Sequence, residues 1–280
     1  MTSLSKAAGP IGIFDSGYGG LTILSAIRQL LPQYDYLYLG DNARAPYGPR
    51  SFDVVYEFTR QAVRYLFEQG CQLVILGCNT ASAKALRTIQ QRDLPQWDAQ
   101  RRVLGIIRPT AEVIGQLTQS RHVGILATEG TIRSESYRLE INKLHPDIHV
   151  AGVACPLWVP LVENNEFASS GADYFVKKCI DQLMTLDPAI DAVILGCTHY
   201  PLLLPKIRQY MPSNVRIISQ GDYVAQSLKD YLLRHADLEC LCSRQSQVHY
   251  LTTESTQTFR DHAQLFLKTP VDEVESIVLV

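Results

Sequence analysis

The sequence predicts an α/β fold of two pseudo-symmetric doubly wound domains, with mostly parallel sheets and an active site in the interdomain cleft. Two observations favour this class. Short apolar runs rich in β-branched residues alternate with longer amphipathic stretches, as in units where helices cover both faces of a parallel sheet. In addition, one strand-and-loop segment occurs twice in the chain. The 280 residues are enough for two such units.

The individual elements follow from the period of the apolar residues and from the turn residues that interrupt it. Strands are expected at 11–14, 36–39, 73–76, 103–107, 123–126, 193–195, 215–218 and 248–251. Helices are expected at 21–30, 51–69, 82–91, 131–144, 172–184, 202–210 and 256–267.

The repeat supports a division into two halves. The residues Val-Ile-Leu-Gly-Cys occupy 74–78 and again 193–197, and Gly-Ile-Phe at 12–14 has a looser counterpart in Gly-Ile-Leu at 124–126. We expect a discontinuous first domain of residues 1–105 plus 218–280 and a second domain of 106–217. The polar run 91–102 and the Arg108-Pro109 step are the expected first crossing, and the return is expected near 218–221.

Composition excludes several classes of protein. The 28 acidic and 26 basic residues are spread along the chain, so no basic face for nucleic acid is expected. Residues 1–10 lack the pattern of a signal peptide and no apolar run could cross a bilayer, which favours a cytoplasmic protein. The seven cysteines have no Cys-x-x-Cys spacing, so we expect reduced thiols rather than disulfides or a zinc ribbon.

Two of these cysteines are candidates for catalysis. Cys78 and Cys197 each end a short apolar strand and precede an expected helix, a place where open α/β sheets bind ligands. A helix N-terminus lowers the pKa of a nearby thiol from about 8.5, so each could act as a base near neutral pH. A single buried cysteine is more often a small apolar side chain. Two copies at equivalent positions favour a pair of thiols facing one cleft.

Polar residues next to the cysteines strengthen this interpretation. Asn79, Thr80 and Thr198 could donate hydrogen bonds to a carboxylate, although each alone could be an ordinary helix cap. His199 could transfer a proton or tune Cys197, and a structural histidine is equally consistent with its spacing. Asp15 ends the first strand, so its carboxylate is expected to point into the same cleft.

No cofactor or metal is expected. The glycines after Asp15 lack the Gly-x-Gly-x-x-Gly register, and no further ligands lie at a metal-binding distance in sequence from Cys197 and His199. Lys84 is interpreted as a solvated helix residue rather than as an anchor for pyridoxal phosphate.

At this point the sequence resembles the bacterial glutamate racemases, within the aspartate/glutamate racemase superfamily. The resemblance extends from about residue 11 to 267 and rests on separate motifs. These are Phe-Asp-Ser-Gly-Tyr-Gly-Gly-Leu at 14–21, Gly-Asp at 40–41 with Pro-Tyr-Gly at 46–48, Gly-Cys-Asn-Thr-Ala at 77–81, Thr-Glu-Gly-Thr at 128–131, Cys-Pro at 155–156 with Pro-Leu-Val-Glu at 160–163, and Gly-Cys-Thr-His-Tyr-Pro at 196–201.

The resemblance implies roles for individual residues. It implies that Asp15 assists Cys78, that Glu163 and His199 assist Cys197, and that these five residues are catalytic. The substrate-binding residues that it implies are Asp15, Ser16, Pro46, Tyr47, Gly48, Cys78, Asn79, Thr80, Thr128, Thr131, Cys197, Thr198 and His199.

The implied reaction interconverts L- and D-glutamate without a cofactor and supplies D-glutamate for peptidoglycan. Cys78 would act on the D face of the α-carbon and Cys197 on the L face. Relatives are usually homodimers, which implies a homodimer here, and no nucleic acid or membrane partner is expected. Some relatives are reported to bind DNA gyrase, and no pattern in this sequence bears on that.

Two segments depart from the family pattern. Ser219-Gln220-Gly221 stands where Asp-Ser-Gly is usual, and Pro109-Thr110 stands in place of Pro-Gly. Both departures concern the crossings between halves rather than the cysteine motifs.

Two other interpretations stay open. One is an aspartate racemase or another two-thiol member of the superfamily with a different side-chain pocket; a one-cysteine decarboxylase is disfavoured because both cysteines are present. The other is an amino-acid sensor or protein-binding regulator without catalytic activity, since a fold alone does not assign activity.

Overall fold

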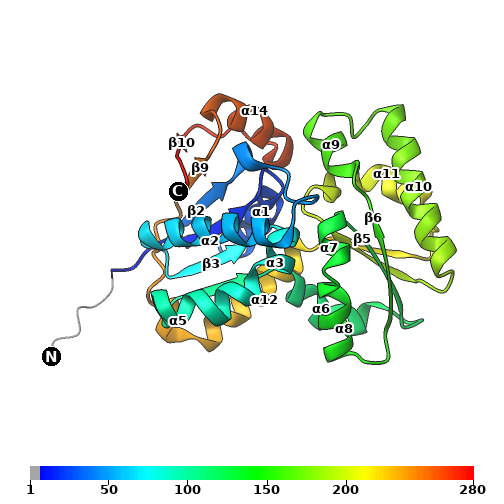
Figure 1. Ribbon diagram of the computed structural model, residues 1–280, viewed down its shortest axis with the longest axis horizontal. Helices are drawn as coiled ribbons and strands as arrows, with labels where there is room; N and C mark the ends of the chain where they lie inside the picture. The colour runs from blue at the N-terminus through cyan, green and yellow to red at the C-terminus, as the bar shows by residue number, and fades with distance from the viewer. Residues whose placement is uncertain (1–6) are drawn as a thin grey trace.

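The structure is a computed structural model that describes residues 7–280. Two parallel sheets lie side by side, each flanked by helices (Figure 1). The first sheet contains, from edge to edge, β10 (Val274–Ser276), β9 (Val248–Thr252), β2 (Tyr36–Gly40), β1 (Ile11–Asp15), β3 (Leu73–Leu76) and β4 (Arg102–Gly105). The second contains β6 (His149–Ala154), β5 (His122–Ala127), β7 (Ala192–Gly196) and β8 (Arg216–Ile218). The predicted α/β class with two parallel sheets is confirmed.

The two sheets share one strand order. The series β6-β5-β7-β8 repeats β2-β1-β3-β4 in the order of the chain, and all these pairs are parallel. The register is also the same, since Gly12 pairs with Val74 in the first sheet and Gly124 pairs with Val193 in the second. The repeat seen in the sequence is therefore a structural repeat, and it places Cys78 and Cys197 after equivalent strands.

Helices connect and cover the strands. In the first part of the chain they are α1 (Gly20–Leu30), η1 (Asn42–Arg44), α2 (Phe52–Glu68), α3 (Asn79–Lys84), α4 (Leu86–Thr88), η2 (Ile89–Asp93) and α5 (Leu94–Trp97). Around the second sheet they are α6 (Ile107–Leu117), α7 (Glu129–Arg133), α8 (Ser136–Leu144), α9 (Trp158–Glu163), α10 (Ser170–Leu186), η3 (Tyr200–Leu203) and α11 (Leu204–Tyr210). The last are α12 (Gly221–Arg234), α13 (Ala236–Glu239) and α14 (Thr256–Leu267). Figure 1 shows α6, α7 and α8 on one side of the second sheet and α10 and α11 on the other.

The long helix α2 illustrates why these segments fold as they do. Ser51 precedes it in an extended conformation and its side chain accepts a hydrogen bond from the Val54 N–H, which satisfies one of the free donors of the first turn. Asp53 adds negative charge where the helix dipole is positive. Its buried residues recur every three or four positions, from Val55 to Phe67, so one face packs against the first sheet.

Several expected elements are wrong in their bounds. The strand expected at 103–107 ends at Gly105, because Ile107 already begins α6. The helix expected at 131–144 is two helices, since Glu135 adopts a left-handed conformation with φ 56° between α7 and α8. The helix expected from residue 82 begins at Asn79. Elements without an expected counterpart are β6, β10, η1, α5, α6, α9, α12 and α13.

The first crossing also differs from the expectation. The run 91–102 does not cross between the halves, because β4 follows it and pairs with β3 in the first sheet. The chain passes to the second sheet only after Gly105, through α6, which contains the Arg108-Pro109 step. It returns after β8 at Ile218, and α12 then packs along α1.

The two halves share buried apolar packing. One cluster of buried side chains runs from Ile23 and Leu24 of α1 to Leu195 and Cys197 of the second half. Along the part of the chain that the structure describes, no helix is both long and apolar enough to cross a membrane.

Gly196, the residue before Cys197, provides a test of this packing. A Cβ atom at this position would lie 2.9 Å from the Ala127 Cβ and 3.1 Å from Tyr137 Cε2, and the Ala127 Cβ cannot rotate away. We expect Gly196→Ala to lower the free energy of unfolding by about 1–3 kcal/mol, because overpacking forces the backbone to shift. Urea denaturation followed by circular dichroism measures this.

Gly171→Ala is the matched control. Gly171 is exposed in the first turn of α10, and the nearest atom to an added Cβ is the Ser169 Oγ at 3.5 Å. Alanine there should be neutral or stabilising by up to about 1 kcal/mol, since it reduces the freedom of the unfolded chain. Equal stability of the two variants would contradict the close packing around Gly196.

Candidate active site

Cys78 lies at the junction of β3 and α3, where it serves as the N-cap of the helix. Its Sγ accepts a hydrogen bond from the Ala81 N–H at 3.4 Å, and the Ser16 Oγ lies 3.4 Å from the same sulfur. The side chain is 6% exposed. The thiol is therefore held in place by the loop after β1 and by the first turn of α3.

Burial controls the protonation of this thiol. Together with the charge on Asp15 it raises the pKa of Cys78 to about 12, although the hydrogen bonds with Ser16 and Ala81 act to lower it. The expected lowering of this pKa by the helix start is wrong for this environment, because desolvation outweighs the start of a six-residue helix. Charge on Cys197 also raises the pKa of Cys78, so the two sulfurs are close enough to interact.

Cys197 follows β7 and lies beside a buried histidine. The His199 Nδ1 is 3.8 Å from the Cys197 Sγ, and the His199 Nε2 is 2.9 Å from Oε1 of Glu163, at the end of α9. Burial acts to lower the pKa of His199, but the hydrogen bonds to Cys197 and Glu163 outweigh it and raise this pKa to about 10. The imidazole therefore carries a positive charge at neutral pH, next to a thiol that is 7% exposed.

Asp15 lies between these two groups of residues. It is 1% exposed and accepts a hydrogen bond from the Gly17 N–H at 2.8 Å. Burial raises the pKa of Asp15 to about 6, although the positive charge of His199 and the amides of Gly17 and Gly20 act to lower it. An acid from the first half of the molecule is thus coupled to the histidine of the second half.

The loop after β1 packs directly on the loop after β7. A Cβ atom on Gly19 would overlap the side chains of Thr198 and His199, so only glycine fits at this contact. The Thr22 Oγ1 donates to the Thr198 carbonyl oxygen at 3.2 Å. The structure therefore brings Asp15, Ser16 and Cys78 together with Cys197, Thr198, His199 and Glu163 at one interface between the halves.

Three threonines meet across the same interface. The Thr80 Oγ1 is 2.9 Å from the Thr128 Oγ1 and 3.4 Å from the Thr131 Oγ1. Thr80 belongs to α3, whereas Thr128 caps α7 and Thr131 lies within it. These hydroxyls contact one another here, and all three can exchange that partner for a carboxylate oxygen.

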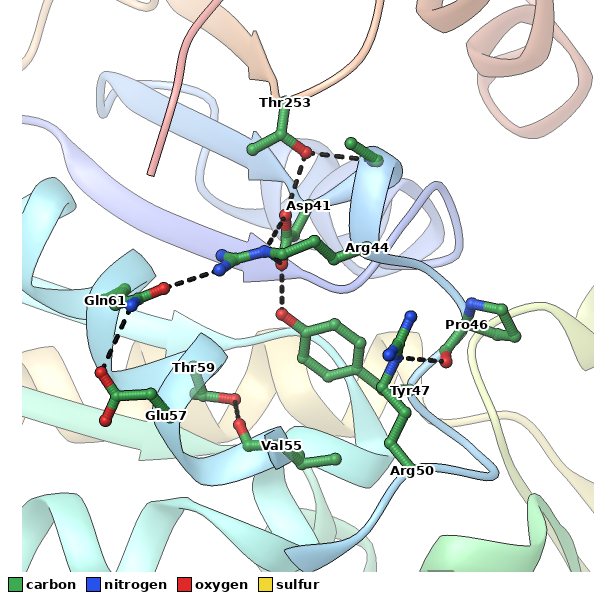
Figure 2. A network of polar contacts seen from close by, with 11 residues as sticks. Asp41, Arg44, Pro46, Tyr47, Arg50, Val55, Glu57, Thr59, Gln61 and Thr253 are labelled. Carbon is green, nitrogen blue, oxygen red and sulfur yellow. Dashed lines mark hydrogen bonds and ion pairs between the residues drawn. The ribbon is translucent and has the colours of Figure 1, made fainter. Parts of the chain in front are cut away.

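The Pro46-Tyr47-Gly48 segment is held from behind by a polar network (Figure 2). In Figure 2 the side chains of Arg44, Tyr47 and Thr253 all point to the Asp41 carboxylate, and each makes a hydrogen bond with it. Asp41 is fully buried, and the Tyr47 ring is 1% exposed. The Tyr47 side chain is thus used for anchoring, while the Gly48 carbonyl oxygen accepts a hydrogen bond from the Gly130 N–H at 3.0 Å.

Three features of the site were not predicted from the sequence. Asp41 belongs to one of the motifs but had no expected function, and Tyr137, whose ring packs on Gly196, was not a candidate. The prediction that Lys84 is a solvated residue is wrong: Lys84 is half-buried, burial lowers its pKa, and its Nζ donates to the Arg50 carbonyl oxygen at 2.6 Å. No spacing in the sequence relates Lys84 to the loop at Arg50.

A cavity of ≈ 160 Å³ adjoins Cys197. Its lining includes Thr22 and Ala26 of α1, Cys197 itself and Gln220, but not Cys78. This cavity therefore adjoins only one of the two thiols.

One group of metal-ligand side chains occurs elsewhere among residues 7–280. The Nδ1 atoms of His122 and His149 lie 2.8 and 2.9 Å from one oxygen of Asp187. Because both histidines begin their strands, this group lies at the opposite end of the second sheet from Cys197. The hydrogen bonds already satisfy the Asp187 carboxylate.

Comparison with known proteins agrees with this geometry. The family model for Asp/Glu/Hydantoin racemase matches residues 21–228. A glutamate racemase of Streptococcus agalactiae serotype III is 38% identical over 96% of this chain and 98% of its own. Crystal structures of glutamate racemases from Bacillus anthracis and, in complex with D-glutamate, from Francisella tularensis align with TM-scores of 0.88 and 0.85. Their identities are 32% and 30%, over 97% of this chain and 98% of each of theirs.

The fold and these similarities define an amino-acid racemase, an isomerase. The chain belongs to the Asp/Glu/Hydantoin racemase family.

The raised pKa of Asp15 predicts how stability depends on pH. Since the folded-state value of about 6 exceeds the ordinary 3.8, the folded state binds this proton more tightly. Stability from this group is complete below pH 3.8 and is lost as the pH rises through 6. We therefore expect Asp15→Asn to raise the free energy of unfolding at pH 8 by about 1–3 kcal/mol, with no gain at pH 4.

Asp191→Asn is the control, for which the opposite change in stability with pH is expected. Although burial acts against ionisation, hydrogen bonds from Thr118 and two backbone amides lower the pKa of Asp191. This variant should lose stability at pH 8 relative to pH 4. Denaturation of both variants at the two pH values measures the effect. A loss of stability at pH 8 in Asp15→Asn would contradict the raised pKa of Asp15 in the folded protein.

Proposed function

We propose that this protein is a cofactor-independent glutamate racemase that uses Cys78 and Cys197 as opposed acid/bases and supplies D-glutamate for peptidoglycan. The observation that carries the proposal is the pair of buried thiols after equivalent strands, β3 and β7, at one interface between the halves. The substrate is inferred from the glutamate racemases to which the chain is 30–38% identical over nearly its full length.

In the direction from L- to D-glutamate, the Cys197 thiolate takes the α-proton and the Cys78 thiol returns one to the opposite face. Two groups are needed because one base cannot reach both faces of a carbon. Cys78 is suited to the second step, since its raised pKa keeps it protonated until a carbanion develops beside it. His199 supports the first step, because its positive charge attracts a thiolate 3.8 Å away and Glu163 orients the ring.

The reverse direction exchanges the roles. Cys78 must then be a thiolate, and the hydrogen bonds from Ser16 and the Ala81 amide favour that form. Asp15, with its pKa of about 6, is the nearby group able to take up or release the proton. Each thiol thus has its own partner for changing protonation state.

Hydroxyl and amide donors around the sulfurs would hold the substrate carboxylates. We assign this role to Thr80, Thr128, Thr131 and Thr198 with the backbone of the Pro46-Tyr47-Gly48 segment. When water is excluded from the site, donors at fixed positions stabilise the negative charge that develops on the α-carboxylate.

We propose that the substrate enters when the halves open, and that residues 1–105 with 218–280 and residues 106–217 move as two domains. This motion would break polar contacts between the halves. They include the Gly130 to Gly48 backbone hydrogen bond and the contacts of Thr80 with Thr128 and Thr131. Closure then excludes water from the thiols.

Exchange of the α-proton in heavy water tests the proposal. Purified protein without added cofactor should incorporate deuterium at the α-carbon of L-glutamate and form D-glutamate, as seen by proton NMR and chiral chromatography. Cys78→Ser and Cys197→Ser should each lower the racemisation rate by at least about 10²-fold, since each removes an essential acid/base.

Cys242→Ser is the matched control. Its thiol is also buried, and it donates to the Leu238 carbonyl oxygen at 3.6 Å, a bond that a serine hydroxyl can replace. This variant should retain the wild-type rate. Exchange with aspartate instead of glutamate would move the substrate assignment to an aspartate racemase, and binding of glutamate without any exchange would indicate a sensor.

A further inference from the structure

Four buried groups form a closed hydrogen-bonded network behind the two cysteines. The Gln220 Oε1 accepts from the Asn79 Nδ2 at 2.7 Å, and the Gln220 Nε2 donates to the Tyr137 hydroxyl at 2.7 Å. The Tyr137 hydroxyl in turn donates to the Asn79 Oδ1 at 2.7 Å. The second hydrogen of the Gln220 Nε2 goes to the Ile106 carbonyl oxygen at 2.9 Å.

The members of the network come from segments next to the thiols and from both crossings between the halves. Asn79 directly follows Cys78, and Tyr137 comes from α8 of the second half. Ile106 lies in the first crossing between the halves, and Gln220 lies in the return crossing. The network therefore joins both crossings to the residue next to one thiol.

Tyr137 connects the network to the other thiol. Its ring packs on Gly196, since a Cβ atom there would lie 3.1 Å from Tyr137 Cε2. The charge of Cys197 also acts on the Tyr137 hydroxyl. Any shift of Tyr137 relative to Asn79 therefore changes the position of Cys197 relative to Cys78.

The geometry leaves Gln220 a single orientation. Only an N–H can donate to the Ile106 carbonyl oxygen, so the Oε1 must face Asn79 and the Nε2 must face Tyr137. The Oε1 and both hydrogens of the Nε2 are used, and Asn79, Tyr137 and Gln220 are each 3% exposed. Movement within this network would break buried hydrogen bonds and leave polar groups unpaired, which is costly.

We propose that Gln220 is a positioning residue that, through Asn79 and Tyr137, sets the distance between the two thiols across the substrate. This role rests on the proposed two-thiol racemisation. It gives a function to the glutamine of Ser219-Gln220-Gly221 at the return crossing. A glutamine provides one acceptor and two donors on a long side chain, and all are needed to reach three partners. It also assigns the Asn79 side chain to positioning, with its backbone amide left for the substrate.

A matched pair of tyrosine variants tests the proposal. Tyr137→Phe removes one hydroxyl from the network. Tyr36→Phe removes another buried hydroxyl, which donates to the Leu31 carbonyl oxygen at 2.6 Å within the first half. If the network sets the distance between the thiols, Tyr137→Phe lowers the kcat of glutamate racemisation in both directions by about tenfold or more, because a displaced acid/base reacts slowly. KM should change by less than about threefold, and Tyr36→Phe should keep the wild-type kcat.

A second readout separates positioning from general destabilisation. In heavy water, a carbanion that waits longer for the opposite thiol is returned more often by the first thiol, after that thiol has exchanged its proton with solvent. The deuterium content of unconverted L-glutamate, relative to the D-glutamate formed, should therefore rise in Tyr137→Phe and not in Tyr36→Phe. Gln220→Met, which keeps the side-chain length without the carboxamide, should behave like Tyr137→Phe and is the alternative if that variant does not fold.

Two outcomes overturn the proposal. If Tyr137→Phe and Gln220→Met match Tyr36→Phe in kcat and in the deuterium ratio, the network has only a structural role. If wild-type protein exchanges no α-proton of glutamate at all, the proposed function fails first, and the role of Gln220 fails with it.

Discussion

The removal of two cysteine thiols from water is the constraint on which the rest of the structure depends. Cys78 and Cys197 are 6% and 7% exposed, and burial alone would keep a thiol protonated and inert. The neighbouring groups counter this cost. Ser16 and the Ala81 amide face Cys78, while His199, charged through its contacts with Cys197 and Glu163, faces Cys197. The loops that carry these groups can meet only where the halves pack closely, as they do at Gly19.

The repeated fold and the unequal surroundings of the thiols serve different purposes. An identical strand order and register place the two sulfurs at equivalent strand ends, which suits a substrate whose two faces must be approached in the same way. Their partners differ: an acid with a pKa of about 6 lies near Cys78, and a base with a pKa of about 10 lies beside Cys197. The two acid/bases can therefore be in opposite protonation states although their backbones are related by the repeat.

Local patterns in the sequence were sufficient for the fold class, the repeat and the grouping of the cysteine motifs. They were insufficient for β6, because His149–Ala154 contains Gly152 and alanines and lies at a half-exposed sheet edge. They also missed α6, which contains Pro109 in its first turn, and the break at Glu135, which depends on a left-handed backbone conformation. The network of Asn79, Tyr137 and Gln220 joins residues 58 to 141 positions apart, so no local pattern could predict it.

The most direct test of the account is a crystal structure of the wild-type protein with glutamate bound. The account predicts that the α-carbon lies between the sulfurs of Cys78 and Cys197, within about 3.5–4 Å of each and on opposite sides of the carbon. A bound glutamate whose α-carbon contacts one sulfur, while the other faces only protein side chains, would contradict it.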